Sequence, residues 1–236
     1  MTHRILKLFA FLGLIVFPLA PAQSQTAERA PDTMAARVLA CASCHGAEGE
    51  GTSDVYFPRL AGKPAGYLYN QLVAFRDGRR RYPPMNYLLE FLPDAYLKHI
   101  AEHFASLRPP FPAPAVPTVS NEILARGEAI ATSGDPQRGI PPCAACHNST
   151  FGGMEPAIPG LLGLRASYIS GQLGAWRYGT RTAIAPDCMQ IVASLLTEDD
   201  VKAVAAFLSS RPAPTDPSFA KRGSLPMPLS CGSEPK

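Results

Sequence analysis

The chain has 236 residues, and its 22 lysines and arginines slightly outnumber its 19 aspartates and glutamates, which gives a formal net charge of +3. Two of these cations, Arg4 and Lys7, lie in an N-terminal segment that we expect to be removed, so the rest of the chain is close to neutral. This balance excludes a protein that holds nucleic acid or another acidic polymer through a strong global field.

Residues 1–22 have the pattern of an export signal. Arg4 and Lys7 precede an almost wholly apolar run over residues 8–19, and Ala20-Pro21-Ala22 offers a small-residue cleavage site. The apolar run is too short to span a bilayer comfortably, and an uncleaved anchor is the alternative. We therefore expect a protein exported to the bacterial periplasm, whose remaining length suits two domains of about 100 residues each.

A cysteine motif ends the first predicted helix, Thr33–Cys44. Cys41-Ala42-Ser43-Cys44-His45 has the spacing Cys-x-x-Cys-His, and this spacing recurs at Cys143–His147. The pattern is that of covalent haem attachment, in which two thiols add to the porphyrin vinyl groups and the histidine ligates the iron. Zinc binding or a thioredoxin-like pair would not need the histidine that follows both cysteine pairs. We predict two haem c groups attached through Cys41, Cys44, Cys143 and Cys146, with His45 and His147 as iron ligands.

Two helices and a methionine complete the first half. Apolar residues at helical spacing predict a helix over Ala65–Asp77 that stops at Gly78, and Pro93 is well placed to start a helix over Pro93–Leu107. Between these helices, Met85 follows two prolines, which stiffen the backbone that presents the thioether. We predict Met85 as the sixth ligand of the first iron; the alternative is a methionine that fills a gap in the core.

A proline-rich segment separates the halves. Residues 108–117 contain five prolines, which cannot continue a helix and favour an extended, semi-rigid spacer. We therefore expect a first domain at residues 23–108, a linker at 109–119, a second domain at 120–211 and an irregular tail at 212–236.

The second half repeats the helical pattern of the first. Helices are predicted over Asn121–Thr132, Ala166–Tyr178 and Glu198–Ser209, and Thr197 with Asp200 three residues later fits a capping box. No segment gives a convincing strand. The sequence therefore predicts an all-α fold with loops that wrap around each haem.

The resemblance between the halves extends beyond the haem motifs. Pro58-Arg59-Leu60-Ala61-Gly62 resembles Pro159-Gly160-Leu161-Leu162-Gly163, and seven residues after it recur 101 positions later. In the first half these are Tyr67, Gln71, Leu72, Phe75, Arg76, Gly78 and Arg80; in the second they are Tyr168, Gln172, Leu173, Trp176, Arg177, Gly179 and Arg181. Such register indicates duplication of a whole domain.

The sixth ligand of the second iron is harder to predict, because Cys188 and Met189 are adjacent and both can bind iron. Beyond this loop the offset between the halves becomes 104, which sets Met189 against Met85 and Cys188 against Pro84. We predict Met189, with Cys188 as the competitor and Met154 as the third choice. Cys188 and Cys231 are left over from haem attachment, and in an oxidising compartment a disulfide is the simplest use of such a pair.

Several arginines surround the predicted ligand loops. Arg76 and Arg79–Arg81 precede Met85, and Arg177 and Arg181 occupy the matching region of the second half. They could be solvated residues at a helix C-terminus, favoured by the helix dipole. They could also pair with the haem propionates or steer an acidic partner. We take Arg76 and Arg177, a matched pair, as the propionate candidates.

With two Cys-x-x-Cys-His motifs, a methionine after each, a proline-rich linker and a repeated Tyr-x-x-x-Gln-Leu helix, residues 33–210 resemble the cytochrome c4 family of dihaem class I cytochromes c. The resemblance implies two tandem all-α cytochrome c domains packed about a pseudo-twofold axis, with their propionates near each other and His/Met ligation at both irons. The chain departs from the family at Asp187-Cys188-Met189 and at Asn148-Ser149, which puts the potential and partner of the second haem in question.

These features predict a periplasmic electron carrier rather than an enzyme, one that passes single electrons between respiratory donors and a terminal acceptor such as an oxidase. Its partners would be redox proteins, with at most peripheral membrane association. One alternative is the cytochrome subunit of a periplasmic dehydrogenase. Another is a dihaem peroxidase or thiosulfate-oxidising enzyme, which would need an open or Cys-ligated axial site at the second haem.

Overall fold

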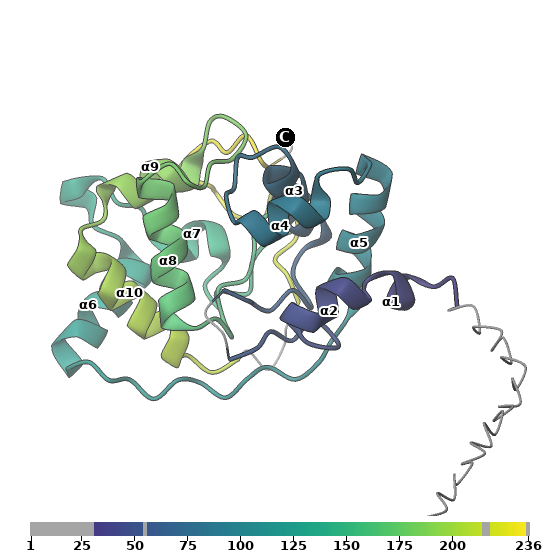
Figure 1. Ribbon diagram of the computed structural model, residues 1–236. Coiled ribbons are helices and arrows are strands. Elements are labelled where there is room, and N and C mark those ends of the chain that lie inside the picture. Colours follow the sequence, from purple (N-terminus) through teal and green to yellow (C-terminus); the bar gives the residue numbers. More distant parts are fainter. Residues whose placement is uncertain (1–30, 54–55, 214–217, 235–236) are drawn as a thin grey trace, which may run out of the picture. The chain divides into compact units, whose positions relative to one another are not determined.

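The computed structural model describes residues 31–53, 56–213 and 218–234 (Figure 1). These residues form helices and loops, with isolated β-bridges but no β-strand among them. The predicted all-α fold is thus confirmed for this part of the chain. The predicted export signal at residues 1–22 lies outside the described residues.

The first half contains helices α1 (Met34–Arg37), α2 (Leu39–His45), α3 (Ala65–Arg76), α4 (Pro83–Leu89) and α5 (Asp94–Ser106). The single helix predicted over Thr33–Cys44 is therefore wrong, because the chain turns at Val38 between α1 and α2. Helix α3 ends where Gly78 takes a φ of +74°, a left-handed conformation that glycine adopts without steric cost.

The second half contains α6 (Asn121–Ser133), the 3₁₀ turn η1 (Pro136–Arg138), α7 (Cys143–His147), α8 (Ala166–Arg177), α9 (Cys188–Leu195) and α10 (Glu198–Ser210). The predicted capping box is confirmed: the Asp200 N–H donates to Thr197 Oγ1 at 3.1 Å, and the Thr197 N–H donates to Asp200 Oδ2 at 2.9 Å. The reciprocal bonds satisfy backbone donors that the start of α10 would otherwise leave unpaired.

Two short helices occupy segments that we expected to be loops. Pro83 and Pro84 fill the first two positions of α4, where a missing N–H costs nothing and the fixed φ of proline suits the helix. Helix α9 begins after Asp187, whose carboxylate accepts from the Gln190 N–H at 3.1 Å. Both predicted methionine ligands consequently lie in the first turn of a helix.

Each half has its own buried apolar cluster, and Figure 1 shows the helices of each half gathered together. The first cluster joins α3, α4 and α5; the second joins α6, α8, α9 and α10. In the second, α6 crosses α10 so closely that a Cβ on Gly127 would lie 2.1 Å from the carbonyl oxygen of Ala203. Only glycine fits at this crossing.

The proline-rich segment is held by both halves. Arg59, a buried side chain of the first half, donates to the carbonyl oxygens of Pro109 and Pro110 at 2.5 and 2.9 Å. The Ala115 N–H donates to the carbonyl oxygen of Ser209 in the second half at 2.9 Å. These contacts agree with an extended spacer, and the domain boundaries themselves stay a prediction.

Candidate haem sites

The two motif histidines are held in the same way. His45 and His147 are 6% and 7% exposed, and their Nδ1 atoms lie 2.9 and 2.8 Å from the carbonyl oxygens of Pro58 and Pro159. Because a carbonyl oxygen only accepts, each Nδ1 carries the hydrogen, and Nε2 keeps its lone pair for a metal. Burial lowers the pKa of both rings, which favours the neutral form that binds iron.

The second site is a cavity with apolar walls. Cys143, Cys146, His147 and Met189 all line it. Its apolar wall includes Ile158, Leu161, Ile169, Leu173, Trp176, Val192, Leu196, Val204 and Leu208. Two thiols, an imidazole and a thioether around one apolar space fit a covalently held haem, whose ring is largely apolar and whose iron takes two axial ligands.

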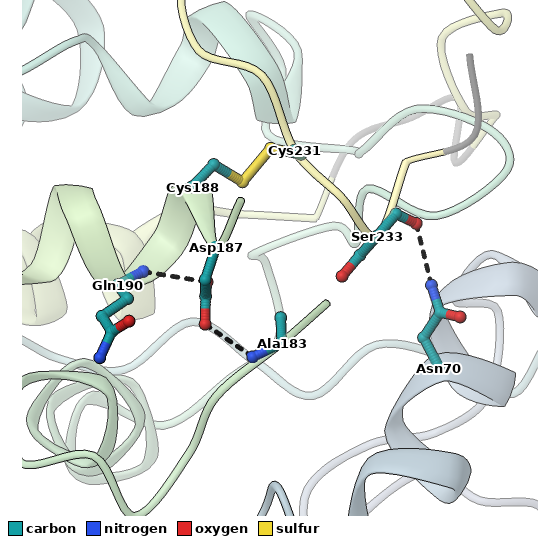
Figure 2. The surroundings of a disulfide bond; sticks show 7 residues. All are labelled: Asn70, Ala183, Asp187, Cys188, Gln190, Cys231 and Ser233. Atoms are coloured by element: carbon teal, nitrogen blue, oxygen red, sulfur yellow. Dashed lines mark hydrogen bonds between the residues drawn. A yellow bond between two sulfur atoms is a disulfide. The ribbon is translucent and has the colours of Figure 1, made fainter. Parts of the chain in front are cut away.

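The two competitors of Met189 are accounted for differently. Cys188 forms a disulfide with Cys231, with an S–S distance of 1.99 Å, so its sulfur is already bonded (Figure 2). Met154 is 1% exposed and does not line the cavity. Both findings favour Met189 as the proposed sixth ligand and agree with the disulfide expected from the cysteine count.

In the first half, Cys41 and Met85 pack against the same apolar cluster, which contains Leu68, Phe75, Leu97 and Phe104. The residue after Met85, Asn86, was missed by the sequence reasoning. Its Oδ1 accepts from the Tyr82 N–H at 2.8 Å, and its Nδ2 donates to the carbonyl oxygens of Phe75 and Arg80 at 2.5 and 2.9 Å. One side chain therefore ties the start of α4 to the end of α3.

The structure does not bring Arg76 and Arg177 to the cavity. Arg76 pairs with Asp94 at 2.6 Å and with Asp77 at 3.0 Å. Arg177 lies instead along a surface groove beside Val116 and Pro117 of the spacer. The arginine of this region that does line the cavity is Arg181, which is buried.

Arg181 and its repeat partner Arg80 form a crossed network between the halves. Arg80 donates to Gln71 at 3.0 Å in its own half, and to Tyr168 and Gln172 across the interface at 2.9 and 2.7 Å. Arg181 mirrors it by donating to Gln172 at 2.8 Å, and to Tyr67 and Gln71 across the interface at 3.3 and 2.8 Å. Lys63, also buried, donates to the carbonyl oxygen of Gly160 at 3.1 Å.

These three cations form no ion pair with a carboxylate in the part of the chain that the structure describes. Burial raises the pKa of the neighbouring Tyr67, but the charges of Arg181, Arg80 and Lys63 outweigh burial and lower that pKa to about 8. Two buried cations and the half-buried Arg80, with no carboxylate paired to them among the described residues, fit the propionates of a haem. The signal was present in the sequence, since Tyr67, Gln71 and Arg80 all recur in the repeat.

Comparison with known proteins agrees with this geometry. The family model for cytochrome c matches residues 33–95. Cytochrome c4 of Pseudomonas aeruginosa is 34% identical over 175 residues, which cover 73% of this chain and 84% of that protein. The chain belongs to the cytochrome c4 family. The structure of reduced recombinant cytochrome c4 from Pseudomonas stutzeri covers 75% of this chain and 95% of its own, with 28% identity and a TM-score of 0.65.

Other relatives of this chain carry a more specific name. A thiosulfate dehydrogenase electron acceptor of Stutzerimonas stutzeri is 37% identical over 174 residues, covering 73% of this chain and 79% of that protein. The thiosulfate dehydrogenase structure from Marichromatium purpuratum matches with a TM-score of 0.66 and 35% identity, over 73% of this chain and 36% of that one.

Family membership establishes two covalently attached haem c groups and a role in electron transfer. When bound, each haem supplies an iron that changes its charge by one electron. The protein contributes the thiols that anchor the rings, the imidazoles fixed by backbone carbonyls, and a buried cationic cluster shared by both halves.

Proposed function

We propose that this chain is the electron acceptor of a periplasmic dehydrogenase, with a thiosulfate-oxidising dehydrogenase as the first candidate. Two relatives at 36% and 37% identity are named for that role, and a thiosulfate dehydrogenase structure contains a region similar to this chain. These similarities support the alternative that the chain is the cytochrome subunit of a periplasmic dehydrogenase. Onward transfer to an acceptor such as an oxidase completes the proposal.

The disulfide of Cys188 is the observation that most supports an electron carrier rather than an enzyme. With that sulfur bonded to Cys231, we propose the axial pairs His45/Met85 and His147/Met189. Two filled axial positions leave no place at either iron for a substrate. Electrons would then enter and leave through protein partners.

The proposed location is the periplasm. The export pattern at residues 1–22 and a disulfide between the two remaining cysteines both fit an oxidising compartment. Among the residues that the structure describes, no helix is long and apolar enough to cross a membrane.

The test uses the ferric holo-protein with both haems attached. Mixed with a purified thiosulfate dehydrogenase and thiosulfate, it should take up two electrons per chain, followed by the haem α-band in a stopped-flow spectrometer. Thiosulfate alone should leave it oxidised.

Catalytic consumption of thiosulfate without the dehydrogenase would instead make the chain an enzyme. If a quinol-oxidising complex reduced the chain but the dehydrogenase did not, the chain would be a carrier between respiratory donors and a terminal acceptor, and not the partner of a dehydrogenase.

A further inference from the structure

The two halves hold their proposed methionine ligands by different means. In the first half, Asn86 makes three hydrogen bonds that fix the turn before Met85. The matching residue in the second half is Gln190, at the offset of 104 that also matches Met85 with Met189. Gln190 is exposed, and its side chain has no hydrogen-bond partner within the described ranges. Asn86 therefore has no side-chain counterpart at that position.

In the second half, a disulfide bond lies next to the proposed ligand Met189. Cys188, the residue before Met189, is bonded to Cys231 of the C-terminal tail (Figure 2). The next tail residue, Gly232, donates its N–H to the carbonyl oxygen of Pro186 at 2.9 Å. A Cβ on Gly232 would lie 2.2 Å from the carbonyl oxygen of Ala185, so the tail runs directly against the ligand loop.

Asp187 completes the loop but leaves it anchored mainly to itself. Its carboxylate accepts from the Ala183 N–H at 2.6 Å and from the Gln190 N–H at 3.1 Å, and both donors belong to the same short segment (Figure 2). These bonds shape the turn. The disulfide and the bond from Gly232 tie it to another part of the protein.

The tail is itself tied down at a third point. Asn70 of α3 donates its Nδ2 hydrogen to the carbonyl oxygen of Ser233 at 3.0 Å (Figure 2). Leu229, Cys231, Ser233 and Glu234 line the same cavity as His147 and Met189. The tail expected to be irregular surface chain thus closes one side of the second haem site and reaches the first half.

We propose that the Cys188–Cys231 disulfide is a positioning brace for Met189, doing for the second haem what Asn86 does for the first. At the second iron, but not at the first, ligation by methionine then depends on whether Cys188 and Cys231 are oxidised to a disulfide or reduced to thiols. The inference rests on Met189 being the axial ligand, as proposed above. A dithiol that reduces the bond transfers two electrons and two protons, leaves Cys188 and Cys231 as thiols and itself becomes a disulfide. The loop then loses its covalent tie to the tail.

The test measures the weak red band of Met-to-ferric-haem ligation in holo-protein with both haems attached. The double variant Cys188→Ser/Cys231→Ser removes the brace and leaves no thiol to compete for iron. We expect it to keep about half of the wild-type intensity, because only the first of two sites is retained. Cys231→Ser alone should show the same loss, although it leaves the Cys188 thiol free.

Single-methionine backgrounds assign the loss to a site. In Met85→Ala, which leaves only the second band, the double serine change should abolish the remaining intensity. In Met189→Ala, which leaves only the first, the same change should have no effect, and Asn86→Ala should reduce the band instead. Full intensity of both bands in the double serine variant would overturn the brace.

A chemical route keeps the proposal testable if the serine variants fail to mature. The wild-type holo-protein is reduced with a phosphine, its thiols are blocked with iodoacetamide, and its haems are reoxidised with ferricyanide. The band of the second site should be lost. If Met189→Ala, made in the otherwise wild-type protein, left the red band unchanged, the assignment of Met189 as ligand would be refuted. That outcome differs from failure of the brace, in which Met189→Ala removes the second band but loss of the disulfide does not.

Discussion

Arg80 and Arg181, which are 101 positions apart in the repeat, pair with each other across an antiparallel backbone bridge, and each guanidinium donates hydrogen bonds into the other half. The flanking residues support the bridge: the Arg81 N–H donates to the Thr180 carbonyl oxygen at 2.9 Å, and the Thr182 N–H donates to the Arg79 carbonyl oxygen at 2.7 Å. Duplicated residues thus meet at the interface that the duplication created.

Aromatic rings support this pair of like charges. The Arg80 guanidinium lies 4.5 Å from the ring centroid of Phe75, and that of Arg181 lies 3.7 Å from the ring of Trp176. Cation–π contacts and neutral acceptors such as Gln71 and Gln172 hold the cations without cancelling their charge. The net positive potential remains available to an anionic group of each haem.

Replacing Arg181 with glutamine should therefore lower the reduction potentials of both haems. A buried cation favours the reduced state, whose charge is one unit more negative, and the Arg181 side chain contacts residues of both halves. We expect shifts of roughly 50 mV, from the interaction of two charges about 10 Å apart in a medium of intermediate dielectric constant. Spectroelectrochemical titration of the holo-protein measures both potentials.

Arg177→Gln is the matched control, because Arg177 lies on a surface groove outside the cavity. It should shift neither potential by more than a fraction of that amount, since solvent screens an exposed charge. Equal shifts in the two variants would show that the buried network has no special role.

The sequence located this region, but it favoured Arg76 and Arg177, whereas the structure places Arg80 and Arg181 in the network between the halves. Arg76 and Arg80 both recur in the second half, so the repeat alone does not separate them. The difference arises at Gly78, whose left-handed φ of +74° ends α3 and redirects the chain. Arg76 remains on the helix beside Asp94, and Arg80 turns toward the other half. The direction of a side chain after such a turn depends on tertiary structure.

Other parts were predictable from local chemistry. The haem motifs, the capping box of Thr197 and Asp200, and the Cys188–Cys231 pair each depend on residue identity at short spacing or on elimination. The contacts of the tail with Asn70 and the three bonds of Asn86 depend on segments brought together by folding. The sequence does not predict the short helix α4, because Pro83-Pro84 indicates a stiff loop as readily as the first turn of a helix.

Gly127→Ala should destabilise the second half by about 2–4 kcal/mol, because a Cβ at this position would overlap the carbonyl oxygen of Ala203 and force α6 away from α10. Gly171→Ala is the control: it lies in α8, is exposed, and its Cβ would meet no atom within 4 Å. That change should stabilise by about 0.5–1 kcal/mol through helix propensity. Denaturant unfolding of the holo-protein measures both, and equal effects would refute the close crossing.

The red absorption band of the ferric protein should have the intensity of two Met-ligated haems. Met189→Ala should leave one, because no other described sulfur is placed to replace it while Cys188 remains in the disulfide. Met154→Leu should leave two, because Met154 is buried away from the cavity. Loss of the band in Met154→Leu with retention in Met189→Ala would reverse the assignment.

Asp200→Asn should lower the stability of the second half and flatten its dependence on acid. The Asp200 carboxylate is 0% exposed and pairs with Arg126 at 2.6 Å and Arg138 at 2.7 Å. Burial alone would raise its pKa, but hydrogen bonds from Arg138, Thr197 and Arg126 outweigh burial and hold that pKa well below its usual range. The carboxylate therefore stabilises the folded state above about pH 4, its ordinary pKa, and this contribution is lost as the pH falls further.

At pH 7 the loss should be about 2–3 kcal/mol, because both arginines are partly exposed and keep some solvation once the charge is gone. The neighbouring Asp199→Asn, at an exposed position of the same first turn, should change stability by less than about 0.5 kcal/mol. Denaturant unfolding at pH 7, 5 and 3 should show the stability difference between the wild type and Asp200→Asn shrinking between pH 5 and pH 3. The reason is that the carboxylate of the unfolded wild type then takes up a proton, while the carboxylate of the folded protein stays ionised. Parallel curves would mean that Asp200 is not ionised in the folded protein.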